Sequence, residues 1–170
     1  MMAEDVTRIY TWLKDEGVTV WIDGGWCVDA LLGMQTRDHS DLDIAVNRND
    51  NDTLRTLLIS GGFTKEEKRP DSSEWMYVLE NENGVKVDVH AFEYDNSGNN
   101  IYGVEYPFGS LAGTGTIDGL KMNCVAPDWM YKFKTSYEPT EKDIKDVQAL
   151  SKKFGYELPE QYATSPQAQP

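Results

Sequence analysis

The chain has 170 residues, enough for one ordinary domain with a single core. Acidic residues outnumber basic ones by 29 to 16, and the resulting net charge of −13 argues against a protein that grips a nucleic-acid backbone. No apolar run approaches the length of a membrane span, residues 1–16 lack the apolar core of a signal peptide, and the two cysteines lie far apart, so we expect a cytoplasmic protein with reduced thiols.

Periodicity and turn residues predict an α/β (α+β) domain with a mixed β-sheet flanked by helices. In chain order, the sequence predicts a helix over 4–16, a strand over 18–22, a helix over 26–32, a strand over 42–46 and a helix over 50–59. It then predicts strands over 63–69, 74–82 and 85–92 with a two-residue hairpin turn at Asn83-Gly84, short strands and turns over 95–120, a strand over 121–125, and helices over 127–137 and 141–154. We therefore expect a core over 1–125, a helical part over 126–158 and a flexible tail over 159–170.

Two glycines and two aspartates form the densest group of candidate site residues. Gly24 and Gly25 separate a strand from a helix, where bare backbone N–H groups and a helix N-terminus can approach a phosphate. Asp41 and Asp43 are two apart on a strand, so their carboxylates share a face and repel unless a cation lies between them. Mg²⁺ suits such a pair, because it takes hard oxygen ligands and shares its shell with substrate phosphates. Each motif alone has a plainer explanation, a tight turn or a solvated strand end, but together they favour a metal–nucleotide site.

A third carboxylate would complete two-metal chemistry, and Asp88 offers one. Its neighbours Val87 and Val89 point to the opposite face of an apolar strand, so packing does not explain an aspartate there. We predict that Asp88 binds the metal or takes a proton from a nucleophile. His90 shares the face of Asp88 and either orients that carboxylate or is a structural histidine.

Basic side chains are needed to hold a triphosphate. Arg37 lies just before the aspartate pair, Lys132 and Lys134 lie on a predicted helix, and Lys142 begins the last helix. For each lysine a solvated surface position is the plainer alternative.

These motifs resemble the nucleotidyltransferase signature of the polymerase-β-like superfamily. Trp-x-Asp-Gly-Gly-Trp-x-x-Asp over 21–29 and Arg-x-His-x-Asp-Leu-Asp over 37–43 are similar to the small antibiotic nucleotidyltransferases, the lincosamide and aminoglycoside 2''-adenylyltransferase group. Further similar segments lie at 87–90, 106–117 and 132–146, so the resemblance covers about residues 5–160.

The resemblance implies a catalytic core over 1–125 whose cleft is closed by the C-terminal helices, and a reaction in which a hydroxyl attacks the α-phosphate of a nucleoside triphosphate and pyrophosphate leaves. It implies two Mg²⁺ ions and the metal-binding, catalytic residues Asp41, Asp43 and Asp88. It implies the nucleotide-binding residues Gly24, Gly25 and Lys132, of which Lys132 is the best match for a triphosphate-binding lysine. We add Arg37 and Lys142 to the nucleotide-binding residues because of their charge. Lys134 departs from the group and receives no role. We expect the substrate-binding residues to be Asp23, Glu105, Tyr106 and Tyr137.

We therefore predict a Mg²⁺-dependent adenylyltransferase with ATP as co-substrate and a small-molecule antibiotic as acceptor, without a nucleic-acid or membrane partner. The acidic balance slightly favours a polycationic aminoglycoside over a lincosamide. One alternative is a nucleotidyltransferase that modifies a protein or RNA, as toxin–antitoxin relatives do. Another is a non-catalytic nucleotide-binding module, against which the presence of all three acids argues. A homodimer would complete an open acceptor site.

Overall fold

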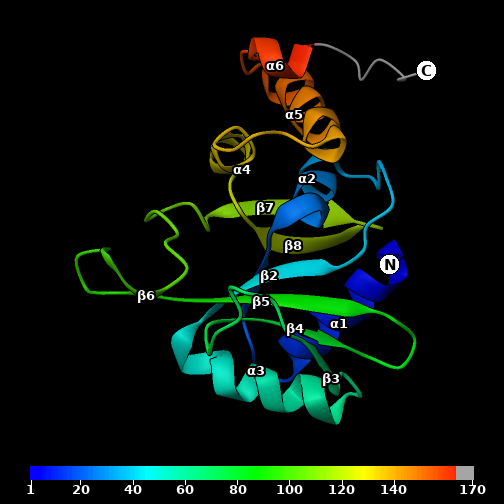
Figure 1. Ribbon diagram of the computed structural model, residues 1–170, viewed down its shortest axis with the longest axis vertical. Helices are drawn as coiled ribbons and strands as arrows, with labels where there is room; N and C mark the ends of the chain where they lie inside the picture. Colours follow the sequence, from blue (N-terminus) through cyan, green and yellow to red (C-terminus); the bar gives the residue numbers. More distant parts are fainter. Residues whose placement is uncertain (164–170) are drawn as a thin grey trace.

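The structure, a computed structural model, describes residues 1–163, which form an eight-stranded mixed sheet with helices on both faces (Figure 1). The strands are β1 (Val20–Ile22), β2 (Leu42–Asn47), β3 (Lys65–Glu67), β4 (Met76–Glu80), β5 (Lys86–Tyr94), β6 (Asn100–Gly103), β7 (Gly113–Ile117) and β8 (Leu120–Cys124). They follow the order β3-β4-β5-β2-β1-β8-β7, and β6 pairs with the C-terminal end of β5. The predicted mixed sheet flanked by helices is thus confirmed.

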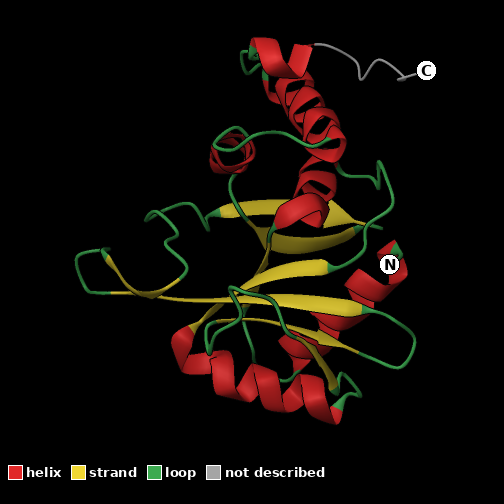
Figure 2. Ribbon diagram, in the orientation of Figure 1, coloured by secondary structure: helices red, strands yellow, loops and turns green. Residues whose placement is uncertain are grey.

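Helices cover the sheet unequally on its two sides, as Figure 2 shows. The described residues form α1 (Ala3–Asp15), α2 (Gly24–Leu32), α3 (Arg48–Ser60), α4 (Pro127–Lys134), α5 (Glu141–Phe154) and α6 (Glu160–Ala163). The helices α1 and α3 lie on one side, and α2 lies on the other with α4 and α5 packed against it. Within this range no helix is both long and apolar enough to cross a bilayer.

Strict alternation in the central strands fixes the register of the sheet. In β2 and β5, Leu42, Ile44, Val87 and Val89 are completely buried on the side of α3. Burying each such side chain contributes roughly 1.5–3 kcal/mol, and a slip of one residue would turn all of them to the other face. The residues between them are therefore held on the face of α2.

Two local boundaries differ from the prediction. The helix α2 begins at Gly24, because the Asp23 carboxylate caps it by accepting the Gly24 N–H at 2.7 Å. The hairpin between β4 and β5 turns through the three residues 82–84, because the Asn81 N–H donates to the Val85 carbonyl at 3.0 Å.

The predicted flexible tail begins instead with the short helix α6. Tyr162 is completely buried, its hydroxyl donates to the Lys134 carbonyl at 2.8 Å, and its own carbonyl accepts from Gln148 Nε2 at 2.7 Å. Residues 160–163 therefore pack on the C-terminal helices, and the rest of the predicted tail lies outside the described residues.

Candidate active site

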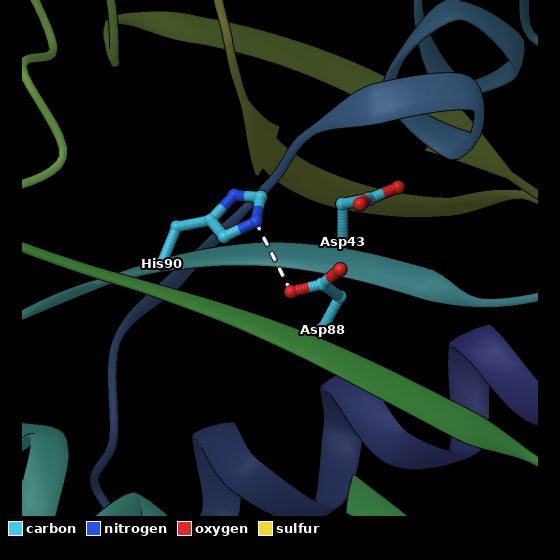
Figure 3. Close-up of side chains that lie close together, drawn as sticks. All are labelled: Asp43, Asp88 and His90. Carbon is cyan, nitrogen blue, oxygen red and sulfur yellow. Dashed lines mark ion pairs between the residues drawn. The ribbon is translucent and has the colours of Figure 1, made fainter. Parts of the chain in front are cut away.

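Two carboxylates face the same way from neighbouring strands. The strands β2 and β5 are parallel, and their register places Asp43 directly beside Asp88. Because side chains alternate along a strand, both carboxylates emerge on the face of α2. Figure 3 shows Asp43 and Asp88 side by side on this face, with the His90 ring turned toward them.

The donor atoms of this group suit a divalent cation. Asp43, Asp88 and His90 each offer one atom within 4.8 Å of the others. Burial and the neighbouring charge of Asp41 raise the pKa of Asp43 to about 7, and a bound cation would remove that penalty on the ionised form. Asp41 lies outside this group of donors and accepts the Ser40 hydroxyl at 3.0 Å. The residues present therefore fit a metal site centred on Asp43 and Asp88.

His90 connects the central carboxylate to a second one. Its Nε2 lies 3.1 Å from Asp88 Oδ1, and its Nδ1 lies 3.8 Å from Asp23 Oδ2, which accepts the Tyr106 hydroxyl at 2.5 Å. Burial lowers the pKa of His90, but the two carboxylates outweigh burial and raise it to about 10. His90 thus lies between two carboxylates and holds Asp88 in a fixed orientation. The structure places Asp23 and Tyr106, which sequence analysis assigns to substrate binding, beside His90 Nδ1, the ring nitrogen that does not contact Asp88.

Gly24 brings the start of α2 against the metal-side carboxylate. Its φ is 58°, and a Cβ added there would lie 2.1 Å from Asp43 Oδ2. Only glycine permits this approach, which sets the free N–H groups of the helix N-terminus beside the carboxylate cluster. The predicted pairing of a glycine turn with the aspartates is thus a direct contact.

We expect Gly24→Ala to weaken divalent-cation binding by at least about tenfold, because its Cβ takes the space of the Asp43 carboxylate. The matched control is Gly33→Ala, since Gly33 has a φ of 83° but only open space around its Cβ position. Both variants carry the strain of a left-handed residue, about 1–2 kcal/mol, and only the first displaces Asp43. Mn²⁺ titration of both proteins measures the effect, and equal losses would assign it to backbone strain.

Gly25 leaves room for two basic side chains. A Cβ at this position would lie 2.3 Å from Arg37 Nη2 and 2.6 Å from His39 Nδ1. The buried Asp29 carboxylate lies 2.5 Å from His39 Nε2 and accepts the Thr36 hydroxyl at 2.5 Å. Asp29 therefore anchors the loop between α2 and β2, and this loop places Arg37 and His39 beside the N-terminus of α2.

Two adjoining cavities open beside Asp43. A polar cavity of about 280 Å³ lies between the start of α2, the loop over 37–41 and the start of α5. A more apolar cavity of about 220 Å³ is walled by Met130 and Phe133 of α4. Both are lined by Asp43, Lys134 and Tyr137, so they form two parts of one cleft between the sheet and the C-terminal helices.

Lys134 is the basic residue at the centre of this cleft. Its Nζ lies 3.0 Å from Asp143 Oδ1 and 2.9 Å from Asp146 Oδ2, and Arg37 binds the same Asp146 carboxylate through Nε and Nη2, each at 2.9 Å. Burial lowers the pKa of Lys134, but Asp146 and Asp143 outweigh it and raise the pKa above its ordinary value. Tyr137 donates its hydroxyl to Asp143 Oδ1 at 2.8 Å. The network ties the loop before β2 to α4 and α5.

Four residues of the predicted site line neither cavity: Asp88 and Tyr106, which contact His90, and Lys132 and Glu105, which are exposed. The Lys132 side chain is 57% exposed, and its Nζ lies 4.1 Å from the centre of the Trp129 ring and 3.8 Å from Asp128 Oδ2. Glu105 is exposed on the loop after β6 and lines neither cavity, whereas Lys142 lines the polar one.

Sequence reasoning missed the roles of Lys134, Asp143, Asp146 and Arg69. A usable signal lay in α5. Asp143 and Asp146 are three residues apart and share one helix face, which indicates a buried cation packed opposite them. Residues two apart on a helix point about 200° apart, so only one of Lys132 and Lys134 can face the cleft. Arg69, 2.6 Å from Asp88 Oδ2, lies in a loop without any pattern that points to it.

The chain is a nucleotidyltransferase, as its match to a known family shows. The sequence model of the aminoglycoside-2''-adenylyltransferase family matches residues 5–150, and the chain therefore belongs to that family, which confirms the resemblance inferred from its motifs.

Individual relatives agree with this assignment. A lincosamide resistance protein from Staphylococcus haemolyticus is 30% identical over 142 residues, which cover 78% of this chain and 84% of that protein. The fold is similar to the lincosamide antibiotic adenylyltransferase LnuA in its lincomycin-bound crystal structure, with a TM-score of 0.76 and 24% identity over 89% of this chain and 97% of LnuA. It is also similar to ANT(2'')-Ia in complex with adenylyl-2''-tobramycin, with a TM-score of 0.69 and 20% identity over 90% of this chain and 89% of that one.

Proposed function

We propose that this enzyme transfers AMP from ATP to a hydroxyl of an amine-bearing antibiotic, an aminoglycoside or a lincosamide, with the help of Mg²⁺. The observation that carries the proposal is the register of β2 and β5, which sets Asp43 beside Asp88 opposite the N-terminus of α2. The family and the lincosamide resistance protein support an antibiotic as acceptor.

The triphosphate occupies the polar cavity in this proposal. The N-terminus of α2 supplies backbone donors there, and Arg37, Lys134 and Lys142 supply positive charge. The nucleoside takes the adjoining cavity beside Met130 and Phe133, where an apolar wall is available to it.

The acceptor hydroxyl gives its proton to Asp88 as its oxygen bonds to the α-phosphorus. The bond from that phosphorus to the pyrophosphate oxygen breaks, and pyrophosphate leaves. His90 orients Asp88 through the contact at 3.1 Å. Asp43 and Asp88, with Asp41 nearby, would hold a pair of Mg²⁺ ions, which would supply Lewis-acid stabilisation of the negative charge on the triphosphate.

The charge of the chain bears on the choice of acceptor. A net charge of −13 attracts polycations, so we propose an aminoglycoside before a lincosamide. A homodimer stays a prediction, which light scattering of the purified protein checks.

We expect Lys134→Ala to raise the KM for the nucleotide by about 10- to 100-fold, because a charge-assisted hydrogen bond contributes roughly 1.5–3 kcal/mol. The matched control is Lys132→Ala on the same helix, which should change this KM by less than about twofold. Steady-state kinetics with each substrate varied in turn measures both. A larger effect from Lys132→Ala would restore Lys132 as the triphosphate ligand.

Pyrophosphate release tests the proposal as a whole. The enzyme is incubated with Mg²⁺ and ATP, GTP, CTP or UTP, alone and with each member of a panel of aminoglycosides and lincosamides. We expect release that depends on both Mg²⁺ and an antibiotic and is fastest with ATP. Tight nucleotide binding without antibiotic-dependent release would favour a protein or RNA acceptor, and the lack of any release would favour a non-catalytic module.

A further inference from the structure

Arg69 lies across the carboxylates of the site. It belongs to the loop between β3 and β4, and its Nη1 lies 2.6 Å from Asp88 Oδ2. Its Nη2 is 3.9 Å from Asp41 Oδ2, and its Nε donates to Glu67 Oε1 at 2.9 Å. A guanidinium thus bridges Asp41 and Asp88, on either side of Asp43, where the negative charge of the site is concentrated.

With this contact, each oxygen of Asp88 faces a partner side chain, and a cation at Oδ2 has to compete with Arg69. His90 engages Oδ1 at 3.1 Å, and Arg69 engages Oδ2. A carboxylate that binds a metal or accepts a proton needs one oxygen available. The His90 side chain is 18% exposed and packed against Asp23 and Tyr106, whereas the Arg69 side chain is 33% exposed and sits on a loop, so Arg69 is the group that can leave.

The same loop closes the space beside Asp88. The cavity there measures about 60 Å³ and is lined by Arg69, Asp71, Ser72 and Met76 together with Asp88 and His90. Pockets that hold small molecules measure roughly 300–1,000 Å³, so an antibiotic cannot enter on this side with the loop in place. Access to Asp88 from this side therefore requires Arg69 and its loop to move.

We propose that Arg69 is a displaceable counter-ion that holds Asp88 in the metal-free protein and is released when a divalent cation binds there. Its release frees residues 68–75 to open the side from which the acceptor hydroxyl reaches Asp88. Glu67 keeps its contact with Arg69 in both states and so limits how far the guanidinium travels. The inference rests on the proposed metal role of the cluster, and it assigns a function to a residue outside the family motifs described above.

Competition of this kind makes removal of Arg69 tighten metal binding. The test is Mn²⁺ binding to the nucleotide-free full chain, followed by electron paramagnetic resonance. We expect Arg69→Gln to bind Mn²⁺ about three- to fivefold more tightly than the wild type, the upper part of the effect that follows from losing a competing ion pair at a partly exposed site. Arg69→Met, which keeps the apolar stem, should change the affinity in the same direction.

Arg55→Gln is the matched control. Arg55 lies on α3 and its side chain is 34% exposed. It pairs at 2.8 Å with Glu66 of β3, the strand that also carries Glu67, and it does not touch the carboxylate cluster. Its Mn²⁺ affinity should stay within twofold of the wild type. In an Asp88→Asn background, Arg69→Gln should no longer tighten binding, because the contested oxygen has lost its charge.

The possible results separate the proposed metal site from the proposed counter-ion role of Arg69. Unchanged or weaker Mn²⁺ binding by both Arg69 variants would overturn the counter-ion role and leave the metal site standing. Failure of the wild type to bind Mn²⁺ at all would overturn the metal site and the counter-ion role together. Tighter binding by Arg55→Gln to the same degree would reduce the effect to a general change in charge and overturn the inference.

Discussion

Asp43→Asn should lower turnover by at least a thousandfold while the protein stays folded. The carboxylate belongs to the donor group and lies against the N-terminus of α2, so under the proposed function its loss removes a metal ligand. A factor of a thousand corresponds to about 4 kcal/mol of transition-state stabilisation, which is within the range of one metal contact. Steady-state turnover measures it, with Asp128→Asn on the exposed face of α4 as the control.

The same variant should be more stable than the wild type in the absence of metal. The pKa of Asp43 is raised to about 7 in the folded protein, against roughly 3.9 in an unfolded chain. Ionisation therefore opposes folding, with a penalty that is absent below about pH 4, grows as the pH rises and is complete above about pH 7.

An asparagine carries no such penalty. At pH 8 we expect Asp43→Asn to raise the melting temperature by several degrees, for a gain of roughly 2–4 kcal/mol. The difference should vanish as the pH approaches 4. A less stable variant at pH 8, or turnover above about a tenth of the wild-type rate, would contradict the metal-site assignment.

Asp88→Asn should separate proton transfer from metal binding. We expect turnover to fall by about two to four orders of magnitude, the usual contribution of a positioned base, while Mg²⁺–nucleotide binding through Asp43 and Asp41 persists. The control is Glu93→Gln, also on β5. Glu93 pairs with Arg48 at 3.0 Å, outside the cleft. Calorimetric nucleotide binding and turnover are measured on the same preparations.

Two outcomes would change the role of Asp88. If nucleotide binding collapses together with turnover, Asp88 acts chiefly as a metal ligand. If turnover survives, the base is another group, and Asp23, linked to His90 at 3.8 Å, becomes the next candidate.

The centre of the site could be predicted from sequence because it depends on alternation. Leu42 and Ile44 fill one face of β2, and Val87 and Val89 fill the same face of β5, which leaves Asp43 and Asp88 no choice of side. The glycine at position 24 was predictable as a strand–helix turn whose backbone a phosphate can approach, but its contact with the Asp43 carboxylate was not.

The cationic groups could not be predicted in this way, because their positions depend on tertiary packing. Lys132 and Lys134 lie on the same predicted helix and carry the same charge, so the sequence does not distinguish them. The position of α5 decides that Lys134 contacts Asp143 and Asp146. Arg69 lies in the loop between β3 and β4 and contacts Asp88 on β5. No local sequence spacing predicts this contact. The helix α6 was missed because a single buried aromatic, Tyr162, anchors a segment whose composition is that of a tail.

The most direct test of the account is the fate of the α-phosphate. The enzyme is incubated with Mg²⁺, an aminoglycoside and ATP labelled either at the α- or at the γ-phosphate, and the antibiotic is then isolated. We predict label in the antibiotic from α-labelled ATP only, with Asp43→Asn giving none. Label transferred from the γ-phosphate, or no label in any aminoglycoside or lincosamide, would contradict the transfer of AMP to an antibiotic by this site.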